Sequence, residues 1–183
     1  MSVPPPDTTV RTISIVEQIV SSVGPWSRLA LAERALRRAL ELATPRDHPL
    51  DPITIAAIES ILDRARAARS ASATGLAAHK AAPAPLLSVK AAQKPAESAL
   101  IGAALALLQT LDAVPRAAAD RAHDQAAGTA AQRCIERTLP LVIPRLLEAW
   151  TALRNDARRL APFDRPDAPA QPPITDQALG PLW

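Results

Sequence analysis

Three residues near the middle of the chain have types and a spacing that could support acid–base or metal chemistry. Asp120, His123 and Asp124 stand at positions i, i+3 and i+4, so on a helix they would share one face. Such a set could hold a divalent cation or a proton-transfer pair. A di-iron site of the ferritin type also needs Glu-x-x-His motifs, which the chain lacks. We therefore keep this trio only as a weak alternative metal site and expect its face to be solvated.

Other patterns give no support for catalysis or for a cofactor. Cys134 is the single cysteine, and His48 and His79 have no partner at zinc-ligand spacing. With five glycines, the chain has neither a Gly-rich phosphate-binding loop nor a Gly-x-Ser-x-Gly nucleophile motif. A Ser-His-Asp arrangement depends on three-dimensional geometry and stays open. We predict no catalytic residue, no cofactor-binding residue and no metal requirement.

Arginine clusters are the second kind of candidate, and they favour binding over catalysis. There are three: Arg34-x-x-Arg37-Arg38, Arg64-x-Arg66-x-x-Arg69 and Arg154-x-x-x-Arg158-Arg159. Most such clusters face solvent beside acids, as Arg37 would between Glu33 and Glu41, four residues away on either side. Arginine is also enriched at protein interfaces. We predict Arg37 and Arg66 as contacts for another protein, with an acidic surface as the natural complement.

The last ten residues form an unusual tail. Ile174, Leu179, Leu182 and Trp183 follow a segment with prolines at 162, 166, 169, 172 and 173. An apolar segment on a proline-rich linker either docks on its own domain or binds another protein. Exposed tryptophan favours docking in cis by a small margin, and both alternatives stay open. Leu179, Leu182 and Trp183 complete the predicted partner-binding set.

From the tail's sequence, its removal is expected to have little effect on folding. Burial of each aliphatic anchor contributes ~1.5 to 3 kcal/mol. Ordering the tail opposes this by ~1 to 2 kcal/mol per residue. The two contributions nearly cancel, so deleting residues 174–183 is predicted to leave a folded bundle.

A single all-α bundle must position these residues. Alanine, the best helix former, is the commonest residue, and there is no tyrosine and one phenylalanine. Residues 98–108 are uncharged and apolar on every side, which predicts a buried central helix from Pro95 to about Val114. The apolar run ends at Gln109, short of the ~18 residues that a membrane span needs. We expect about five or six helices, with Ala104 and Leu107 almost fully buried.

Proline and glycine positions divide the chain. We predict a disordered lead over residues 1–7, a helical bundle over 8–161 and a Pro-rich tail over 162–183 that ends in an apolar docking segment. Within the bundle, Asp51-Pro52 begins a helix whose continuity to residue 82 is left open by Gly75. Pro115 is expected to begin the helix after the central one, and the last helix spans about 144–160.

Charge and leader signals narrow the function classes further. The net charge is only +3, and acids and bases are interspersed, so we expect no duplex nucleic acid as partner. The N-terminus has no basic region followed by an apolar core, so no secretory signal is predicted and a cytoplasmic location is the default. No membrane span is predicted either.

Two functions from different classes follow. The first is a non-catalytic helical protein–protein interaction module: an adaptor, an inhibitor or an immunity-type binder, with self-association also open. Residues 75–82, Gly-Leu-Ala-Ala-His-Lys-Ala-Ala, resemble in composition the alanine-rich immunity proteins of bacterial toxin systems. The second is a helical-bundle enzyme or ligand binder that holds a metal or small molecule between helices. Metal analysis of the purified protein would separate the two.

Overall fold

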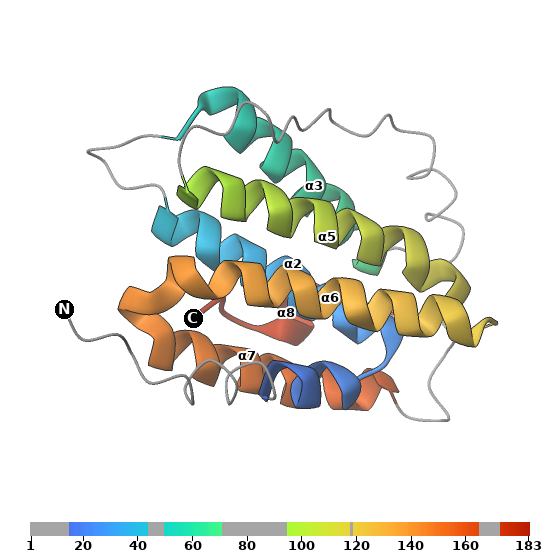
Figure 1. The fold of residues 1–183 in the computed structure, drawn as a ribbon. Coiled ribbons are helices and arrows are strands. Elements are labelled where there is room, and N and C mark those ends of the chain that lie inside the picture. Colours follow the sequence, from blue (N-terminus) through green and yellow to red (C-terminus); the bar gives the residue numbers. More distant parts are fainter. Residues whose placement is uncertain (1–14, 44–49, 71–94, 118, 165–172) are drawn as a thin grey trace.

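The protein is an all-α bundle, as its composition predicts. The computed structural model describes residues 15–43, 50–70, 95–117, 119–164 and 173–183, and these contain no strand. After helical residues 15–21 come α2 (Pro25–Ala43), α3 (Pro52–Ser70), α5 (Pro95–Ala117), α6 (Arg121–Val142), η2 (Ile143–Arg145), α7 (Leu146–Leu160), η3 (Ala161–Asp164) and α8 (Asp176–Leu179) (Figure 1).

The predicted central apolar helix is confirmed as α5. Ala104 and Leu107 have no exposed surface, and α5 packs against α2, α3 and α6. Gly102 lets α6 approach closely, because a Cβ added there would lie 2.7 Å from Nη1 of Arg137. That same guanidinium donates to the Gly102 carbonyl at 2.8 Å. An uncharged helix with small residues therefore forms one side of the core.

By length and composition alone, α5 could cross a membrane. Its most apolar 18-residue window has a mean hydropathy of 1.5, and 56% of that window is buried inside the fold. The prediction counts only the apolar run before Gln109, and this run is shorter than the apolar part of α5. A core helix needs the same composition as a membrane span, and α5 packs here against three neighbouring helices.

A second helix, α2, is enclosed as fully as α5. It packs against α3, α5, α6 and α7, and its buried residues include Glu33, Arg34 and Arg38. The expectation that Glu33 lies on an outer face is wrong, because Glu33 is only 1% exposed. Amphipathic spacing cannot indicate this burial, since the apolar side of α2 is covered by some helices and its charged side by others.

Helix boundaries differ from the prediction mainly at prolines. Pro115 lies inside the last turn of α5 instead of beginning the next helix. The start of α6 is set by Asp120, whose side chain accepts a hydrogen bond from the Ala122 amide at 2.8 Å. A side-chain cap supplies an acceptor for an otherwise unpaired amide, which a proline cannot do.

Some predictions concern residues outside the described ranges. These are the disordered lead over residues 1–7, the loop histidine His48, the possible continuation of α3 through residues 71–82 with His79, and the Pro-rich linker between residues 165 and 172. Before that linker, residues 161–164 form the short helical turn η3.

The packing of α5 generates the first prediction. Changing Leu107 to Ala should lower the free energy of unfolding by about 2 to 5 kcal/mol, because apolar contact is lost and a cavity remains. Leu147→Ala on α7 is the matched control, since Leu147 is 81% exposed, and it should change stability by less than about 0.5 kcal/mol. Denaturant unfolding measures both. Equal effects would contradict the central position of α5.

Candidate functional site

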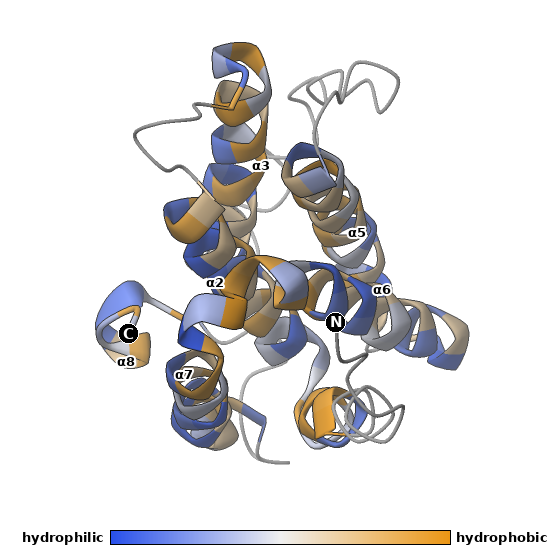
Figure 2. Cartoon of the chain, turned by 60° about the vertical axis from the view of Figure 1, so that its left-hand side comes forward, coloured by the Kyte–Doolittle hydropathy of each residue, from blue (hydrophilic) through white to orange (hydrophobic). Residues whose placement is uncertain are grey.

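The C-terminal segment, residues 173–183, docks on the bundle in cis. It lies beside α2 and α7, with α8 as its single helical turn (Figures 1 and 2). Ile174 and Leu179 have no exposed surface. We call the residues that receive it the tail-docking site: Arg34 and Arg38 of α2, Arg69 of α3 and Arg159 of α7.

Guanidinium groups hold the second half of this segment by its backbone. Four successive carbonyls, those of Leu179, Gly180, Pro181 and Leu182, accept hydrogen bonds from three arginines. Arg34 Nη1 donates to the Gly180 carbonyl at 3.1 Å and Nη2 donates to the next carbonyl. Arg38 Nε donates to the Leu182 carbonyl at 2.6 Å. These contacts do not depend on the tail's side chains.

The first half of the segment is joined to the end of α3. The Ile174 amide donates to the Arg69 carbonyl at 2.8 Å. The Ile174 carbonyl accepts from Arg69 Nη1 at 2.5 Å and from Ser70 Oγ at 3.2 Å. The Asp176 carboxylate pairs with both Arg66 and Arg69. Arg69 therefore contacts the tail through its backbone and its side chain together.

Two buried carboxylates hold Arg34, Arg38 and Arg69 in place through other N–H groups of their guanidiniums. Asp156 of α7 accepts from Arg34 Nε at 3.0 Å and from Arg38 Nη2 at 2.5 Å. Glu33 accepts from Arg69 Nε at 3.1 Å. Each of these five side chains is at most 5% exposed. Three guanidiniums carry more N–H donors than two carboxylates can accept, and the tail carbonyls take up others.

Burial disfavours the charged form on both sides of this cluster. Burial raises the pKa of Asp156, although the neighbouring Arg38 and Arg34 oppose the increase. Burial likewise lowers the pKa of Arg38, and Asp156 opposes that decrease. Charges removed from water are stable only when paired and hydrogen-bonded. The cluster thus depends on every acceptor present, including those of the tail.

These bonds alter what the tail is expected to contribute to stability. The expectation from the sequence compares only the free energy of apolar burial with the entropy of ordering the tail. It leaves out the carbonyl acceptors that the tail provides to buried guanidiniums. Deleting residues 174–183 would leave those donors without their partners, and each lost partner of a charged group costs stability. The tail's contribution is therefore expected to be larger than the sequence suggests.

A glycine lets the chain turn out of α8. Gly180 has φ 68° and ψ −161°, a backbone conformation that residues other than glycine rarely adopt. A Cβ at this position would also lie 2.7 Å from Nη1 of Arg159. The α8 turn begins with the Thr175 side chain, which accepts from the Ala178 amide at 3.3 Å. Both ends of α8 are thus specified locally.

Trp183 lies against η2 and α2. Its Nε1 donates to Glu41 Oε2 at 2.8 Å. The Arg145 guanidinium lies 4.2 Å from the ring centroid, and that of Arg38 lies 5.9 Å away. Cations within about 6 Å of an indole face are attracted to it. The tryptophan is therefore held by its polar edge and its face.

Of the predicted partner-binding residues, the structure brings four together. Leu179, the last residue of α8, is buried. Leu182 and Trp183 are half-buried, and Arg66 pairs with Asp176. Arg37 is half-buried and bonded to Glu33 at 2.8 and 3.0 Å. The sequence missed Arg34, Arg38, Arg69, Arg159, Glu33 and Asp156 as site residues, although all six lie in or beside the noted arginine clusters.

The alternative metal trio is not assembled into one cluster. Asp120 caps α6 and lies 2.5 Å from His123 Nδ1, and the amide of Ala122 lowers the pKa of this carboxyl. Asp124 instead pairs with Arg28 at 2.6 Å. Within the described ranges, no three His, Cys, Asp or Glu side chains are grouped so that they could hold a metal.

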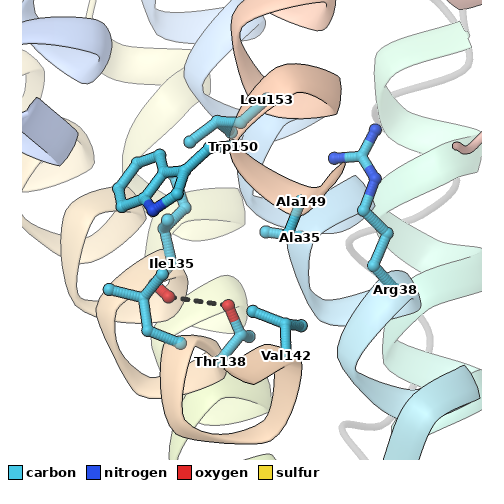
Figure 3. A pocket seen from close by; sticks show the side chains of 9 residues that line it. Ala35, Arg38, Ile135, Thr138, Val142, Ala149, Trp150 and Leu153 are labelled. Atoms are coloured by element: carbon cyan, nitrogen blue, oxygen red, sulfur yellow. Dashed lines mark hydrogen bonds between the residues drawn. The ribbon is translucent and has the colours of Figure 1, made fainter. Parts of the chain in front are cut away.

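The described pockets include a small space between helices and wider hollows of about 420 to 520 Å³ that are open at the surface. A pocket between α2, α6 and α7 has a volume of about 20 Å³ and is lined by Ala35, Trp150 and Leu153 among others (Figure 3). That is room for about one water. Cys134 is completely buried, and its burial raises the pKa of the thiol far above its ordinary range. A buried neutral thiol is unreactive.

Comparison of the chain with protein families, with curated protein sequences and with solved structures found no match. The assignment of function therefore rests on the geometry of the tail-docking site.

The charge cluster generates the second prediction. Arg69→Ala should lower the free energy of unfolding by about 3 to 5 kcal/mol, because it removes a buried ion-pair partner. Arg66→Ala is the matched control. Arg66 pairs with the same Asp176 but is 52% exposed in its side chain, so its removal should change stability by less than about 1 kcal/mol. Urea denaturation of the two variants checks this difference. If Arg69→Ala is as mild as the control, the cluster does not bind the tail as described.

Asp176 generates a pH prediction. Burial alone would raise the pKa of Asp176, but Arg69 and Arg66 together hold it below its ordinary value of 3.8. A carboxyl whose folded pKa is lowered contributes stability above its unfolded pKa and loses it as pH falls through the folded one. Asp176→Asn should therefore be less stable than wild type at neutral pH. The difference should shrink below pH 3.8, as measured by urea denaturation across pH. A pH-independent difference would argue against the ion pairs.

Proposed function

We propose that this protein is a non-catalytic helical module that binds another protein at the tail-docking site. One observation carries the proposal: three arginines bind four successive backbone carbonyls of a chain segment. Backbone recognition supplies affinity for an extended segment, while a few side-chain positions supply specificity. A segment from a partner that has the same backbone course could make the same bonds.

The side-chain contacts suggest what such a partner segment carries. Ile174 and Leu179 are completely buried, and Asp176 between them meets two arginines. A partner would thus offer two apolar side chains five residues apart with an acidic one after the first. This agrees with the expectation of an acidic partner, because Arg66, Arg69, Arg38 and Arg145 all face the segment.

The docked tail would compete with any such partner. A segment linked to its own site acts at an effective concentration in the millimolar range when the linker is short and flexible. A partner must therefore bind more tightly than the tail or meet a chain whose tail is released. Weakening the tail's own docking should raise partner binding by the same factor.

The alternative, a helical enzyme or small-molecule binder, would have to use hollows of about 420 to 520 Å³ that are open to solvent, one of them lined by Arg28 and Asp124. The pocket in Figure 3 has a volume of about 20 Å³, whereas sites for small organic ligands enclose roughly 300 to 1,000 Å³. Asp120, His123 and Asp124 do not converge on a common point.

Partner capture tests the proposal. The immobilised full chain and its Leu179→Asp variant would be exposed to lysate of the native host, and bound proteins quantified by mass spectrometry. Leu179→Asp places a charge at a buried anchor, so it should release the tail and raise capture of a specific protein several-fold. Leu147→Asp makes the same change at an 81% exposed leucine and should leave capture unchanged.

Two further measurements make the capture experiment decisive. Circular dichroism must show that Leu179→Asp, with and without Arg34→Ala, remains helical and melts cooperatively. Adding Arg34→Ala to Leu179→Asp should abolish the gain, because Arg34 donates to two of the four carbonyls. Equal capture by Leu179→Asp and Leu147→Asp, or a gain that survives Arg34→Ala, would contradict the proposal.

A further inference from the structure

We propose that the tail-docking site accepts the C-terminal segment of a second copy of this chain, so that two copies exchange tails and form a dimer. The inference rests on the proposed function only in that the same site takes a segment from another chain. We infer the occupant of the site from the structure, because residues 173–183 already fit the site in cis.

The tail's contacts do not depend on the linker that carries it. Its described polar contacts with the rest of the chain go to α2, α3, η2 and α7: to Arg34, Arg38, Glu41, Arg66, Arg69, Ser70, Arg145 and Arg159. Its two completely buried side chains, Ile174 and Leu179, belong to the segment itself. A tail from another copy can therefore make the same bonds at the same site.

The described residues on either side of the linker, residues 165–172, are anchored at different turns of α2. At its start, Asp164 accepts from Ser27 Oγ at 2.8 Å. At its end, Ile174 is bonded to Arg69, which also bonds Glu33. Positions 27 and 33 are about 9 Å apart along the helix axis and point in different directions. Docking in cis thus sets a minimum length for residues 165–172.

The ratio of cis-docked monomer to tail-exchanged dimer then depends on protein concentration and on linker length. The contacts are the same in both forms, so cis docking wins in dilute solution through its effective concentration. Shortening the linker penalises only the cis form, and short connections are known to favour exchange of identical segments. The exchanged form is closed and two-fold, since each copy gives one tail and receives one.

A linker variant tests the exchange in the full chain. Deleting residues 166–171 leaves two linker residues that span about 11 Å at most between Asp164 and Pro173. Docking in cis with this linker would require the two anchoring points on α2, which lie about 9 Å apart along its axis and point in different directions, to be joined within that span. Light scattering should show a dimer for this variant and a monomer for wild type at the same dilute concentration.

Its matched control keeps the short linker but adds Leu179→Asp, which removes the buried anchor from the tail. This double variant should be monomeric. If the short-linker variant is a folded monomer, or if the double variant is still a dimer, tail exchange is excluded.

A second measurement detects trans binding without changing the linker. A fluorescein-labelled peptide of residues 173–183 would be titrated into full-length Leu179→Asp, whose own tail is released. Fluorescence anisotropy should show saturable binding. The same peptide carrying Leu179→Asp should bind at least ten-fold more weakly, and equal binding of the two peptides would overturn the inference.

The outcomes separate this inference from the proposed function. Dimerisation and peptide binding without capture of a host protein would support tail exchange and remove the proposed partner. Capture that depends on Arg34, with neither dimer nor peptide binding, would support the proposed function and overturn tail exchange.

Discussion

The guanidinium groups of Arg34, Arg38 and Arg69 are almost completely removed from water, and the rest of the structure has to satisfy them. A buried unpaired charge is far more unfavourable than a lost apolar contact. Glu33 and Asp156 compensate part of this charge, and backbone carbonyls of the tail accept further N–H groups. The arginines therefore make the packing of α2, α3 and α7 and the position of the C-terminal segment depend on one another.

This dependence shapes how the site could bind. Five contacts to the tail run from arginine side chains to its backbone carbonyls, so the site could recognise the course of a chain as well as its side chains. Specific recognition comes from the two buried anchors and from Asp176. A replacement segment must accept hydrogen bonds from the same guanidiniums. Without such a segment, these buried positive charges would lose acceptors while they remain poorly solvated.

The candidate site was partly visible in the sequence. The tail's apolar anchors and the arginine clusters were both recognisable, and four of the five predicted contact residues meet at one place in the fold. The pairing between them was not visible. Asp156 lies 122 residues from Arg34 and 118 from Arg38, and a backbone carbonyl has no signature in the sequence. A distant partner also divides the trio on α6: Asp124 pairs with Arg28, while Asp120 and His123 stay 2.5 Å apart at the start of the helix.

Local patterns by themselves determined the all-α class, the burial of Ala104 and Leu107 and the presence of a docking segment after a proline-rich stretch. These properties follow from helix propensity and from apolar periodicity, which act within a few residues. Only the tertiary structure decided that Glu33, Arg34, Arg38 and Arg69 are interior residues. At helical spacing, a row of arginines has the same pattern whether it meets solvent or another segment. Which of the two covers it is set by distant parts of the chain, here α7 and the tail, whose acceptors make the burial of these charges possible.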